Sequence, residues 1–487
     1  MSDSRLVFFI SKITVAMATE NYQSEIINAV PNEMRDQKSF AAVILAAGQG
    51  TRMESKRAKV LHPVAGKPMI EYAVDMAKFS GAEKIVVVIG HQGEQVRALL
   101  NDQVEFAEQP EQRGTGDAVK CARNALENRA AHVLVFYADM PLLKAETIRA
   151  LVEKHRATSA TLTMLTVISD DAMNFGRIAR DENGKALRIV EEVEATPQEF
   201  AINEINPGVY CFNAQWLWKN LEQIKPSPKK GEYYLTDLLE IAVRQRVSIE
   251  TETIYDAAQC VGINTRVQLA HAESIMRARI RERVMLNGAT LIDPATTFID
   301  ADVEIGQDTT IFPNTHLQGE TRIGNDCKIG PNAIISDSVI GDACTIGPSM
   351  IESATLEDHV DMGPFCHLRA GAYLSRRVHL GNYAEVKKSR LGEGVHMGHF
   401  SYMGDADVGA HTNIGAGTIT CNYDGKNKHQ TIIGENVFIG SDSMLVAPLT
   451  IGDNARTGAG AVITKNVPPN SLAVGVPARV IRKMNKE

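Results

Sequence analysis

Two patterns of hydrophobic and polar positions divide this chain. From residue 305 to about residue 463 an aliphatic side chain directly precedes a glycine again and again, and the glycines recur at intervals built on six residues. Pairs six residues apart are Gly324/Gly330, Gly341/Gly347, Gly392/Gly398, Gly409/Gly415, Gly434/Gly440 and Gly452/Gly458. A parallel β-helix uses this period, because each hexad forms a short strand whose aliphatic residue fills the axis and a corner where glycine relieves the backbone. Three hexads close one coil, which predicts roughly eight to ten coils.

Before residue 290 the pattern changes to continuous apolar runs that alternate with amphipathic segments. The runs at residues 41–46, 84–90 and 132–137 indicate buried strands, and helical patterns occupy residues 69–80, 93–100 and 116–128. Strands that alternate with helices predict a mostly parallel sheet covered on both faces. We therefore expect an α/β domain over residues 40–264, a linker helix over residues 265–287 that ends at Asn287-Gly288, and a hexapeptide-repeat domain over residues 288–487.

Residues 1–39 follow neither pattern, and we expect a disordered extension with Met17 or Met34 as alternative starts. Lys12 interrupts the short apolar stretch of residues 6–10, which makes a signal peptide the less favoured interpretation.

Composition narrows the class of protein. A net charge of -8 over 487 residues argues against nucleic acid or an anionic membrane as the main partner. No apolar run reaches the roughly 20 residues of a membrane span. The seven cysteines show no CxxC spacing, which indicates free thiols in a reducing compartment and a cytoplasmic protein.

Candidate chemistry in the α/β domain gathers at the carboxyl ends of its strands. The glycine-rich turn at residues 48–52 follows the first strand, and Arg52 and Lys59 add cations that suit a triphosphate. Asp139 follows the third strand, where it either holds Mg²⁺ or caps the next helix. Gln109 and the Gly114-Thr115 turn could form hydrogen bonds with the edge of a nucleotide base, or they could be an ordinary polar loop.

The β-helix by itself predicts only a rigid support for assembly. A short Asn422–Gly425 segment breaks the hexad register, however, and such breaks in a solenoid are usually loops on a binding face. His399 stands near this break; a lone histidine there is either a packed corner residue or a general base, for which an imidazole suits neutral pH.

Together these residues resemble a known family. Leu45-Ala-Ala-Gly-Gln-Gly-Thr-Arg52, Lys59-Val-Leu-His-Pro and Gly66-Lys-Pro look like the signature of sugar-1-phosphate nucleotidyltransferases. With hexapeptide repeats behind it, the chain resembles the bacterial bifunctional N-acetylglucosamine-1-phosphate uridyltransferase/glucosamine-1-phosphate acetyltransferase family, from about Ala41 into the last coils. The resemblance implies a Rossmann-like domain followed by a left-handed parallel β-helix, with Mg²⁺ and acetyl-CoA required and a homotrimer as the assembly.

For the uridyltransferase, the resemblance implies UTP phosphate contacts at Leu45, Ala46, Ala47, Gly48, Arg52 and Lys59, uracil contacts at Gln109, Gly114 and Thr115, further nucleotide-sugar contacts at Tyr137, Ala138, Asp139, Gly176, Glu191, Asn206, Tyr234 and Asn264, and Mg²⁺ ligation by Asp139 and Asn264. Three neighbours depart from the family pattern: Ala58 replaces a proline, Ala138 replaces a glycine, and Pro207 follows Asn206.

For the acetyltransferase, the resemblance implies His399 as the general base, sugar-phosphate contacts at Arg369, Lys387, Tyr402 and Asn413, and acetyl-CoA contacts at Ala416, Asn422, Tyr423, Ser441 and Ala459. Val476 stands where the family can place an arginine near the CoA site, and Arg479 is the candidate substitute.

The function that the resemblance implies is synthesis of UDP-N-acetylglucosamine for peptidoglycan and lipopolysaccharide, with glucosamine-1-phosphate, acetyl-CoA, N-acetylglucosamine-1-phosphate and UTP as substrates. One alternative is a single-activity nucleotidyltransferase with a regulatory β-helix. Another is an oligomeric scaffold with an inactive nucleotide site. The His399–Tyr402 and Asn422-Tyr423 motifs argue against the first, and intact Arg52, Lys59, Asp139 and Asn264 argue against the second.

Overall fold

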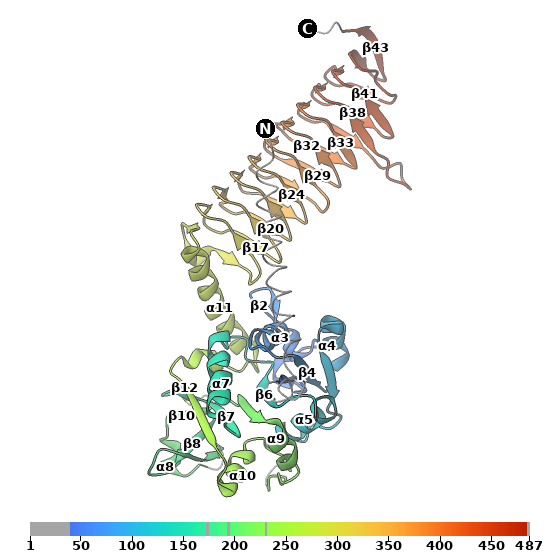
Figure 1. The fold of residues 1–487 in the computed structure, drawn as a ribbon. Coiled ribbons are helices and arrows are strands. Elements are labelled where there is room, and N and C mark those ends of the chain that lie inside the picture. Colours follow the sequence, from blue (N-terminus) through green and yellow to red (C-terminus); the bar gives the residue numbers. More distant parts are fainter. Residues whose placement is uncertain (1–38, 172–174, 192–194, 229–230, 485–487) are drawn as a thin grey trace, which may run out of the picture. The chain divides into compact units, whose positions relative to one another are not determined.

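The chain consists of two compact units in the computed structural model, which describes residues 39–171, 175–191, 195–228 and 231–484 (Figure 1). Unit 1 runs to Val64 and from Pro68 to Ala272, and unit 2 comprises Ala65–Lys67 and everything from Glu273 onward. The extension expected at the amino terminus and its alternative starts lie outside the described residues, apart from Ser39.

Unit 1 is built on one mixed sheet with the strand order β5-β4-β1-β6-β11-β7-β10-β8-β9, and β12 pairs with β7. Its strands are β1 (Phe40–Leu45), β4 (Lys84–Ile89), β5 (Glu105–Glu108), β6 (His132–Tyr137), β7 (Leu162–Ile168), β8 (Gly176–Arg180), β9 (Ala186–Val190), β10 (Glu204–Asn206), β11 (Tyr210–Asn213) and β12 (Ile249–Ile254). Strands β4, β1 and β6 are parallel, as the sequence predicts, and β5, which was not predicted, extends this parallel part of the sheet. Strand β11 runs antiparallel to β6 and β7, a reversal that the apolar pattern did not reveal.

Helices cover both faces of this sheet. They are α3 (Met69–Phe79), α4 (Gly93–Leu100), α5 (Thr115–Cys121), α6 (Arg123–Leu126), α7 (Ala145–Thr158), α8 (Pro197–Phe200), α9 (Ala214–Leu221) and α10 (Asp237–Gln245). Alternate residues of β1 belong to different cores: Ala42 and Ile44 pack in one cluster, whereas Val43 packs in the other. The helix expected over residues 116–128 is in fact two helices, α5 and α6, which meet at Ala122.

Smaller elements complete unit 1 and lead into unit 2. The short 3-10 turns are η1 (Thr51–Met53), η2 (Lys59–Leu61), η3 (Asn101–Gln103) and η5 (Ala257–Cys260), and β2 (Pro63–Val64) pairs with β3 (Lys67–Pro68). Helix α11 (Arg266–Leu286) occupies the segment expected to be a linker helix, and the two units divide within it.

Unit 2 is a three-sided parallel β-helix whose coils are stacked along one axis (Figure 1). The first side holds β13 (Thr290–Leu291), β16 (Thr310–Ile311), β19 (Lys328–Ile329), β22 (Thr345–Ile346), β25 (Asp361–Met362), β28 (His379–Leu380), β31 (His396–Met397), β34 (Asn413–Ile414), β37 (Phe438–Ile439), β40 (Arg456–Thr457), β42 (Ser471–Gly475) and β43 (Ala478–Lys483), with η6 (Pro294–Thr296) after the first strand.

The second side holds β14 (Phe298–Ile299), β17 (His316–Gln318), β20 (Ile334–Ser336), β23 (Met350–Glu352), β26 (His367–Leu368), β29 (Ala384–Lys387), β32 (Ser401–Gly404), β35 (Ile419–Cys421), β38 (Met444–Val446) and β41 (Val462–Ile463). The third side holds β15 (Glu304–Ile305), β18 (Arg322–Ile323), β21 (Val339–Ile340), β24 (Thr355–Leu356), β27 (Tyr373–Leu374), β30 (Arg390–Leu391), β33 (Ala406–Val408), β36 (Thr431–Ile433) and β39 (Leu449–Ile451). Nine to ten strands on these sides agree with the predicted number of coils.

The hexad residues have the roles that their period predicts. The aliphatic residue of each strand points inward, so Ile311, Ile329 and Ile346 form one fully buried column. Glycine at the corners allows neighbouring coils to approach closely, since a Cβ on Gly381 would lie only 1.8 Å from the carbonyl oxygen of Gly398. A side chain at this corner would therefore push two coils apart.

The predicted register break is an insertion in one coil. Asp407 of β33 pairs with Ile432 of β36, a spacing of 25 residues, whereas the adjacent pair Arg390 and Asp407 is separated by 17. Pairing resumes in register after the insertion, because Ile432 pairs with Thr450 of β39. The extra residues therefore leave the prism without disturbing its stacking.

Two further findings concern the cysteines and the helices. All seven cysteines are free, and five of them are buried. Among the described residues, no helix is both long enough and apolar enough to cross a membrane.

A buried histidine makes unit 1 sensitive to acid. His155 of α7 is fully buried, with Nε2 3.0 Å from Nδ1 of His132 and Nδ1 2.9 Å from Oγ1 of Thr163. Burial, with a smaller effect of the charges of His132 and Arg156, lowers the pKa of His155 from 6.5 to about 4. Between these two pH values the unfolded chain therefore binds a proton at His155 and the folded chain does not. The free energy of unfolding consequently falls as the pH drops from about 6.5 towards 4.

We expect His155→Gln to weaken this acid sensitivity, because glutamine does not titrate. Protonation of His155 lowers the free energy of unfolding of the wild type by roughly 3 kcal/mol when the pH has fallen to about 4. Melting midpoints measured from pH 7.5 to 4.5 should fall less steeply in this variant than in the wild type. His91→Gln, at an exposed histidine, serves as the control and should keep the wild-type slope. Equal slopes in all three proteins would contradict the role assigned to His155.

Candidate active sites

Unit 1 contains two adjoining cavities at the carboxyl ends of β1 and β6. The smaller, of about 310 Å³, is lined by predicted site residues Leu45, Ala46, Ala47, Gly48, Lys59, Gln109, Gly114, Thr115, Tyr137 and Asp139. The larger, of about 1220 Å³, is lined by Arg52 and Asn264 and shares Tyr137 and Asp139 with the first. Ala138 lies beneath them, where its N–H donates to the carbonyl of Leu45 at 3.0 Å. The fold thus brings distant segments of the predicted site to one rim of the sheet.

Two side-chain oxygens converge on one cation at this rim. Lys59 Nζ lies 2.5 Å from Asp139 Oδ2 and 3.0 Å from Asn264 Oδ1. The backbone fixes the two acceptors relative to each other, because the N–H of Ile263 donates to the carbonyl of Asp139 at 3.0 Å. A carboxylate and an amide oxygen that share one cation position have the donor chemistry that Mg²⁺ prefers. The residues present therefore fit the expected metal.

Gln109 is held in one orientation. It is almost completely buried, and its Nε2 donates to the carbonyl of Gly114 at 3.0 Å and to Asp117 Oδ2 at 2.9 Å. With the nitrogen engaged within the protein, the side-chain carbonyl oxygen is the group presented to a ligand. This arrangement suits recognition of an N–H on the edge of a base.

The walls of the smaller cavity contain two further fixed groups. Burial raises the pKa of Tyr137, and the carboxylates of Asp139 and Glu191 raise it further, so the hydroxyl stays protonated as a donor. Gly208 packs against this ring, because a Cβ there would lie 2.3 Å from Tyr137 Cε2. Gln112 donates from Nε2 to the carbonyl of Ala47, which holds the chain at the start of the glycine-rich turn.

The remaining predicted residues of unit 1 form their own group. Gly176 and Asn206 are partners in the β8–β10 pairing, and a Cβ on Gly176 would lie 3.7 Å from Glu191 Oε1. Burial raises the pKa of Tyr234, and the charge of Glu191 adds a smaller effect in the same direction. In the described part of the chain, none of these four residues lines either cavity.

In unit 2, the predicted base and three predicted acetyl-CoA residues form a column along one corner of the prism. His399, Ala416, Ser441 and Ala459 each follow the glycine of a hexad, on four successive coils. Backbone hydrogen bonds of 2.6 to 2.8 Å join the corner residues of these coils. His399 is exposed at this corner, where a dissolved substrate can reach it.

A cationic cluster lies at the opposite edge of the second side, at the carboxyl ends of its strands. Lys387 ends β29, and Arg369 follows β26 on the coil before it. Contact with Lys428, followed by the charge of Arg369, lowers the pKa of Lys387. Three cations that repel one another in this way favour a doubly charged anion such as a phosphate monoester.

Polar groups lie between the column and this cluster. The Tyr402 hydroxyl and Asn422 Nδ2 both lie over Gly404. They are 2.3 and 2.8 Å from the point that a Cβ on this glycine would occupy. Asn422 Nδ2 also donates to Asp405 Oδ2 at 2.5 Å, and Asn413 pairs with His396 on the neighbouring side. Tyr423, at the start of the inserted loop, is exposed. The predicted residues of unit 2 therefore assemble around one side of the prism and its two corners.

Two residues of this site were missed by sequence analysis. Glu385 pairs with Tyr402 in register and accepts from Arg369 Nη1 at 3.1 Å. Its spacing of 17 residues from Tyr402 is the spacing of a coil, so the repeat itself contained the signal. Lys428 lies in the inserted loop, where Tyr423 and Lys428 form an isolated bridge, and no repeat arithmetic applies there.

The contact proposed for Arg479 stays a prediction. Val476 is 74% exposed, and Arg479 pairs with Val474 across the β42–β43 hairpin.

Comparisons with known proteins agree with this geometry. Residues 41–253 match the nucleotidyl transferase family model, and residues 302–337, 320–353 and 430–465 match the model of the bacterial transferase hexapeptide (six repeats). Curated relatives named bifunctional protein GlmU match nearly the whole chain. The relative from Geobacillus sp. (strain WCH70) is 47% identical over 446 residues, 92% of this chain and 96% of the relative. That from Geotalea uraniireducens (strain Rf4) is 46% identical over 452 residues, 92% of this chain and 98% of the relative.

The chain belongs to the bifunctional GlmU family. It is accordingly an enzyme with a nucleotidyltransferase domain and a hexapeptide-repeat acyltransferase domain, as the sequence predicts. The matched hexapeptide segments agree with the left-handed parallel β-helix expected for unit 2.

We expect Lys428→Met to weaken binding of the sugar phosphate to unit 2. Removing one of three cations from a dianion site should raise the KM of acetyl transfer for that substrate by about 10-fold, as is usual for a charge-assisted contact. Lys426→Met is the matched control, because Lys426 lies in the same loop with its side chain exposed. Steady-state kinetics that show equal KM values in both variants would show that Lys428 does not contribute to binding by the cationic cluster.

Proposed function

We propose that unit 2 acetylates glucosamine-1-phosphate with acetyl-CoA and that unit 1 then transfers a uridyl group from UTP to the N-acetylglucosamine-1-phosphate formed. Acetylation comes first because its product is the substrate of the second step. The final product, UDP-N-acetylglucosamine, supplies peptidoglycan and lipopolysaccharide synthesis. We infer that the enzyme acts in the cytoplasm as a homotrimer.

The convergence of Asp139 and Asn264 on Lys59 supports the uridyl transfer. In this step a phosphate oxygen of the sugar attacks the α-phosphorus of UTP, the bond to the β-phosphate oxygen breaks, and pyrophosphate leaves. The chain must position two anions and neutralise their charge, and it needs no nucleophile of its own. Lys59 and Arg52 supply positive charge beside the turn at residues 45–48, whose backbone N–H groups suit phosphate oxygens.

Mg²⁺, held by Asp139 and Asn264, would supply the remaining charge neutralisation on the phosphates. Lys59 bridges these two oxygens in the present arrangement, so it must move towards the phosphates when the metal binds. Among the described residues, no group of three or more His, Cys, Asp or Glu side chains converges on one point. The metal is therefore expected to complete its coordination with substrate and water oxygens.

The corner column of unit 2 supports the acetyl transfer. The amino nitrogen of the sugar attacks the thioester carbonyl, the carbon–sulfur bond breaks, and CoA leaves as its thiolate while His399 takes the proton of the amine. Arg369, Lys387 and Lys428 hold the sugar phosphate at the far edge of the second side. Tyr402 and Glu385 lie between them on the second side, Asn413 lies on the neighbouring first side, and all three would orient the sugar ring. The small side chains of Ala416, Ser441 and Ala459 would admit the pantetheine arm along the next coils.

Asp139→Ala should abolish uridyl transfer and leave acetyl transfer nearly intact. Without the carboxylate the metal-bound triphosphate loses its main electrostatic support, and a fall of at least about 10²-fold in kcat is expected. Both activities should be measured on one preparation, with N-acetylglucosamine-1-phosphate supplied directly to the uridyl assay. Equal loss of both activities in a folded protein would show that the two reactions are not assigned to separate units.

His399→Ala should have the opposite effect. Acetyl transfer is expected to fall by roughly 10²–10⁴-fold, the usual contribution of a positioned base, while uridyl transfer persists. His396→Ala, at a neighbouring histidine of the same coil, controls for loss of packing. If His399 were only a corner residue, its substitution would lower the melting midpoint and spare turnover per folded molecule.

A further inference from the structure

Two turns of unit 1 carry the cations of its candidate site, and they pack directly against each other. Arg52 lies in η1, and Lys59 is the first residue of η2. Gly50, which directly precedes η1, has a φ of +62°, and a Cβ there would lie 2.7 Å from the Cβ of Lys59. The position of each cation therefore depends on how the other turn is held.

One arginine side chain joins the ends of both turns. Arg266 of α11 donates from Nε to the carbonyl of Met53, the last residue of η1, at 3.1 Å. Its Nη1 lies 3.3 Å from Nδ1 of His62, the residue directly after η2. All three residues belong to unit 1, because the two units divide within α11 after Ala272. A planar guanidinium that engages two partners fixes the two turns relative to each other more firmly than a single contact would.

The contact with Arg266 defines the state of the His62 ring. A guanidinium N–H can only donate, so Nδ1 of His62 accepts and the imidazole is neutral. His62 is buried, and burial, followed by the charges of Arg266 and Arg57, lowers the pKa of its imidazole from 6.5. The acceptor that Arg266 requires is therefore present at neutral pH.

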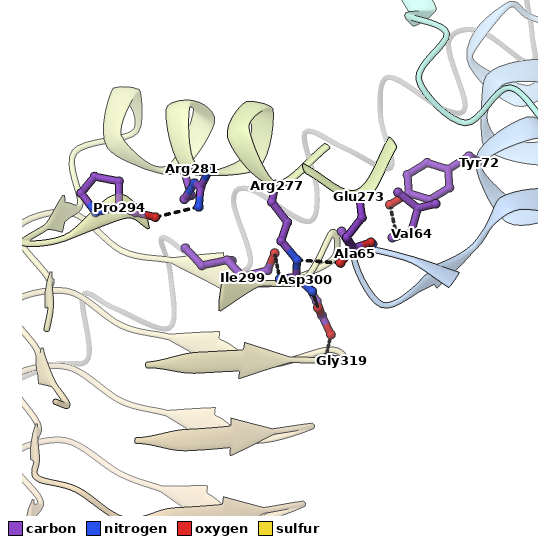
Figure 2. A network of polar contacts seen from close by, with 10 residues as sticks. All are labelled: Val64, Ala65, Tyr72, Glu273, Arg277, Arg281, Pro294, Ile299, Asp300 and Gly319. Atoms are coloured by element: carbon purple, nitrogen blue, oxygen red, sulfur yellow. Dashed lines mark hydrogen bonds and ion pairs between the residues drawn. The ribbon is translucent and has the colours of Figure 1, made fainter. Parts of the chain in front are cut away.

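The backbone around His62 is held within unit 1 by α3. The N–H of Met69 donates to the carbonyl of His62 at 3.2 Å, and the hydroxyl of Tyr72 donates to the carbonyl of Val64 at 2.8 Å (Figure 2). These two bonds fix the chain after η2 on α3, but they do not connect η2 with η1. Arg266 makes that connection through a side chain.

Arg266 also lies close in the sequence to Asn264, a proposed ligand of Mg²⁺. The side-chain oxygen of Gln268 accepts from the N–H of Asn264 at 2.8 Å and from that of Thr265 at 3.1 Å, which fixes the chain at the start of α11. The contact of the Lys59 ammonium with Asn264 is expected to break when the metal binds. The bonds of Arg266 involve neither of these two side chains, so they continue to hold both turns beside the start of α11.

We propose that Arg266 positions Arg52 and Lys59 for nucleotidyl transfer by holding η1 and η2 at the start of α11. This inference rests on the proposed function of unit 1. Arg266 is a positioning residue, because in the described part of the chain it lines neither cavity and acts through the two turns. A small error in the placement of charged groups at the phosphates lowers the rate of transfer more than it weakens binding of the nucleotide.

The first test compares Arg266→Ala with Arg244→Ala in the full-length protein. We expect Arg266→Ala to lower kcat of uridyl transfer about 10-fold, the usual effect of losing hydrogen bonds to a charged group, with a smaller change in KM for UTP. Acetyl transfer, which is assigned to unit 2, should be unchanged. Arg244, an exposed arginine of α10, provides the control and its variant should match the wild type. Wild-type kcat in a folded Arg266→Ala protein would overturn the positioning role.

Two substitutions of His62 separate positioning from packing and cover the case in which Arg266→Ala does not fold. In His62→Asn the amide oxygen takes the place of Nδ1 and can accept from Arg266, whereas the side chain in His62→Leu fills more of the buried volume and accepts nothing. Positioning by Arg266 predicts that kcat per folded molecule stays near the wild-type value in His62→Asn and falls in His62→Leu. Equal values, or the opposite order, would reduce the contact to packing and overturn the proposal. A wild-type enzyme without uridyl transfer would instead overturn the proposed function.

Discussion

The ladder of backbone hydrogen bonds between successive coils is the constraint on which unit 2 depends. Because each strand pairs in parallel with its equivalent on the next coil, residues 16 to 18 positions apart in the sequence are neighbours in space. The ladder places His399 next to Ala416, Ser441 next to Ala459, and Glu385 next to Tyr402, and it also joins Ala416 to Ser441 across the insertion, where the spacing is 25. A site built in this way inherits its precision from the backbone, and its side chains need few contacts with one another.

Charge is arranged differently in the two sites. In unit 1 the Lys59 ammonium is already paired with Asp139 and Asn264, so the proposed metal ion and triphosphate would replace one set of interactions with another. In unit 2 the cations Arg369, Lys387 and Lys428 outnumber the nearby carboxylate of Glu385, and the proposed sugar phosphate would balance them. Under the proposed function, binding in unit 1 would exchange one set of ionic partners for another, whereas binding in unit 2 would neutralise excess positive charge.

Much of this architecture could be predicted from the sequence, since both folds repeat a short local pattern. The hexads predicted the coils, and the buried runs predicted β1, β4 and β6 within one residue. The antiparallel strand β11 could not be predicted, because its hydrophobic pattern does not encode strand direction. Lys428 was missed because it lies in an insertion outside the repeat, and the partners of Arg266 were missed because Met53 is 213 positions away. Such contacts depend on tertiary packing, which a local pattern does not contain.

The insertion after Cys421 shows how this scaffold can change during evolution. Pairing resumes at Ile432 with the same side chains facing inward, so the inserted residues do not change the strand pairing of the coils on either side. Loops of different length and composition can therefore be exchanged at this corner without new core mutations. Substrate recognition in such a solenoid can diverge one coil at a time, independently of the stability of the rod that displays it.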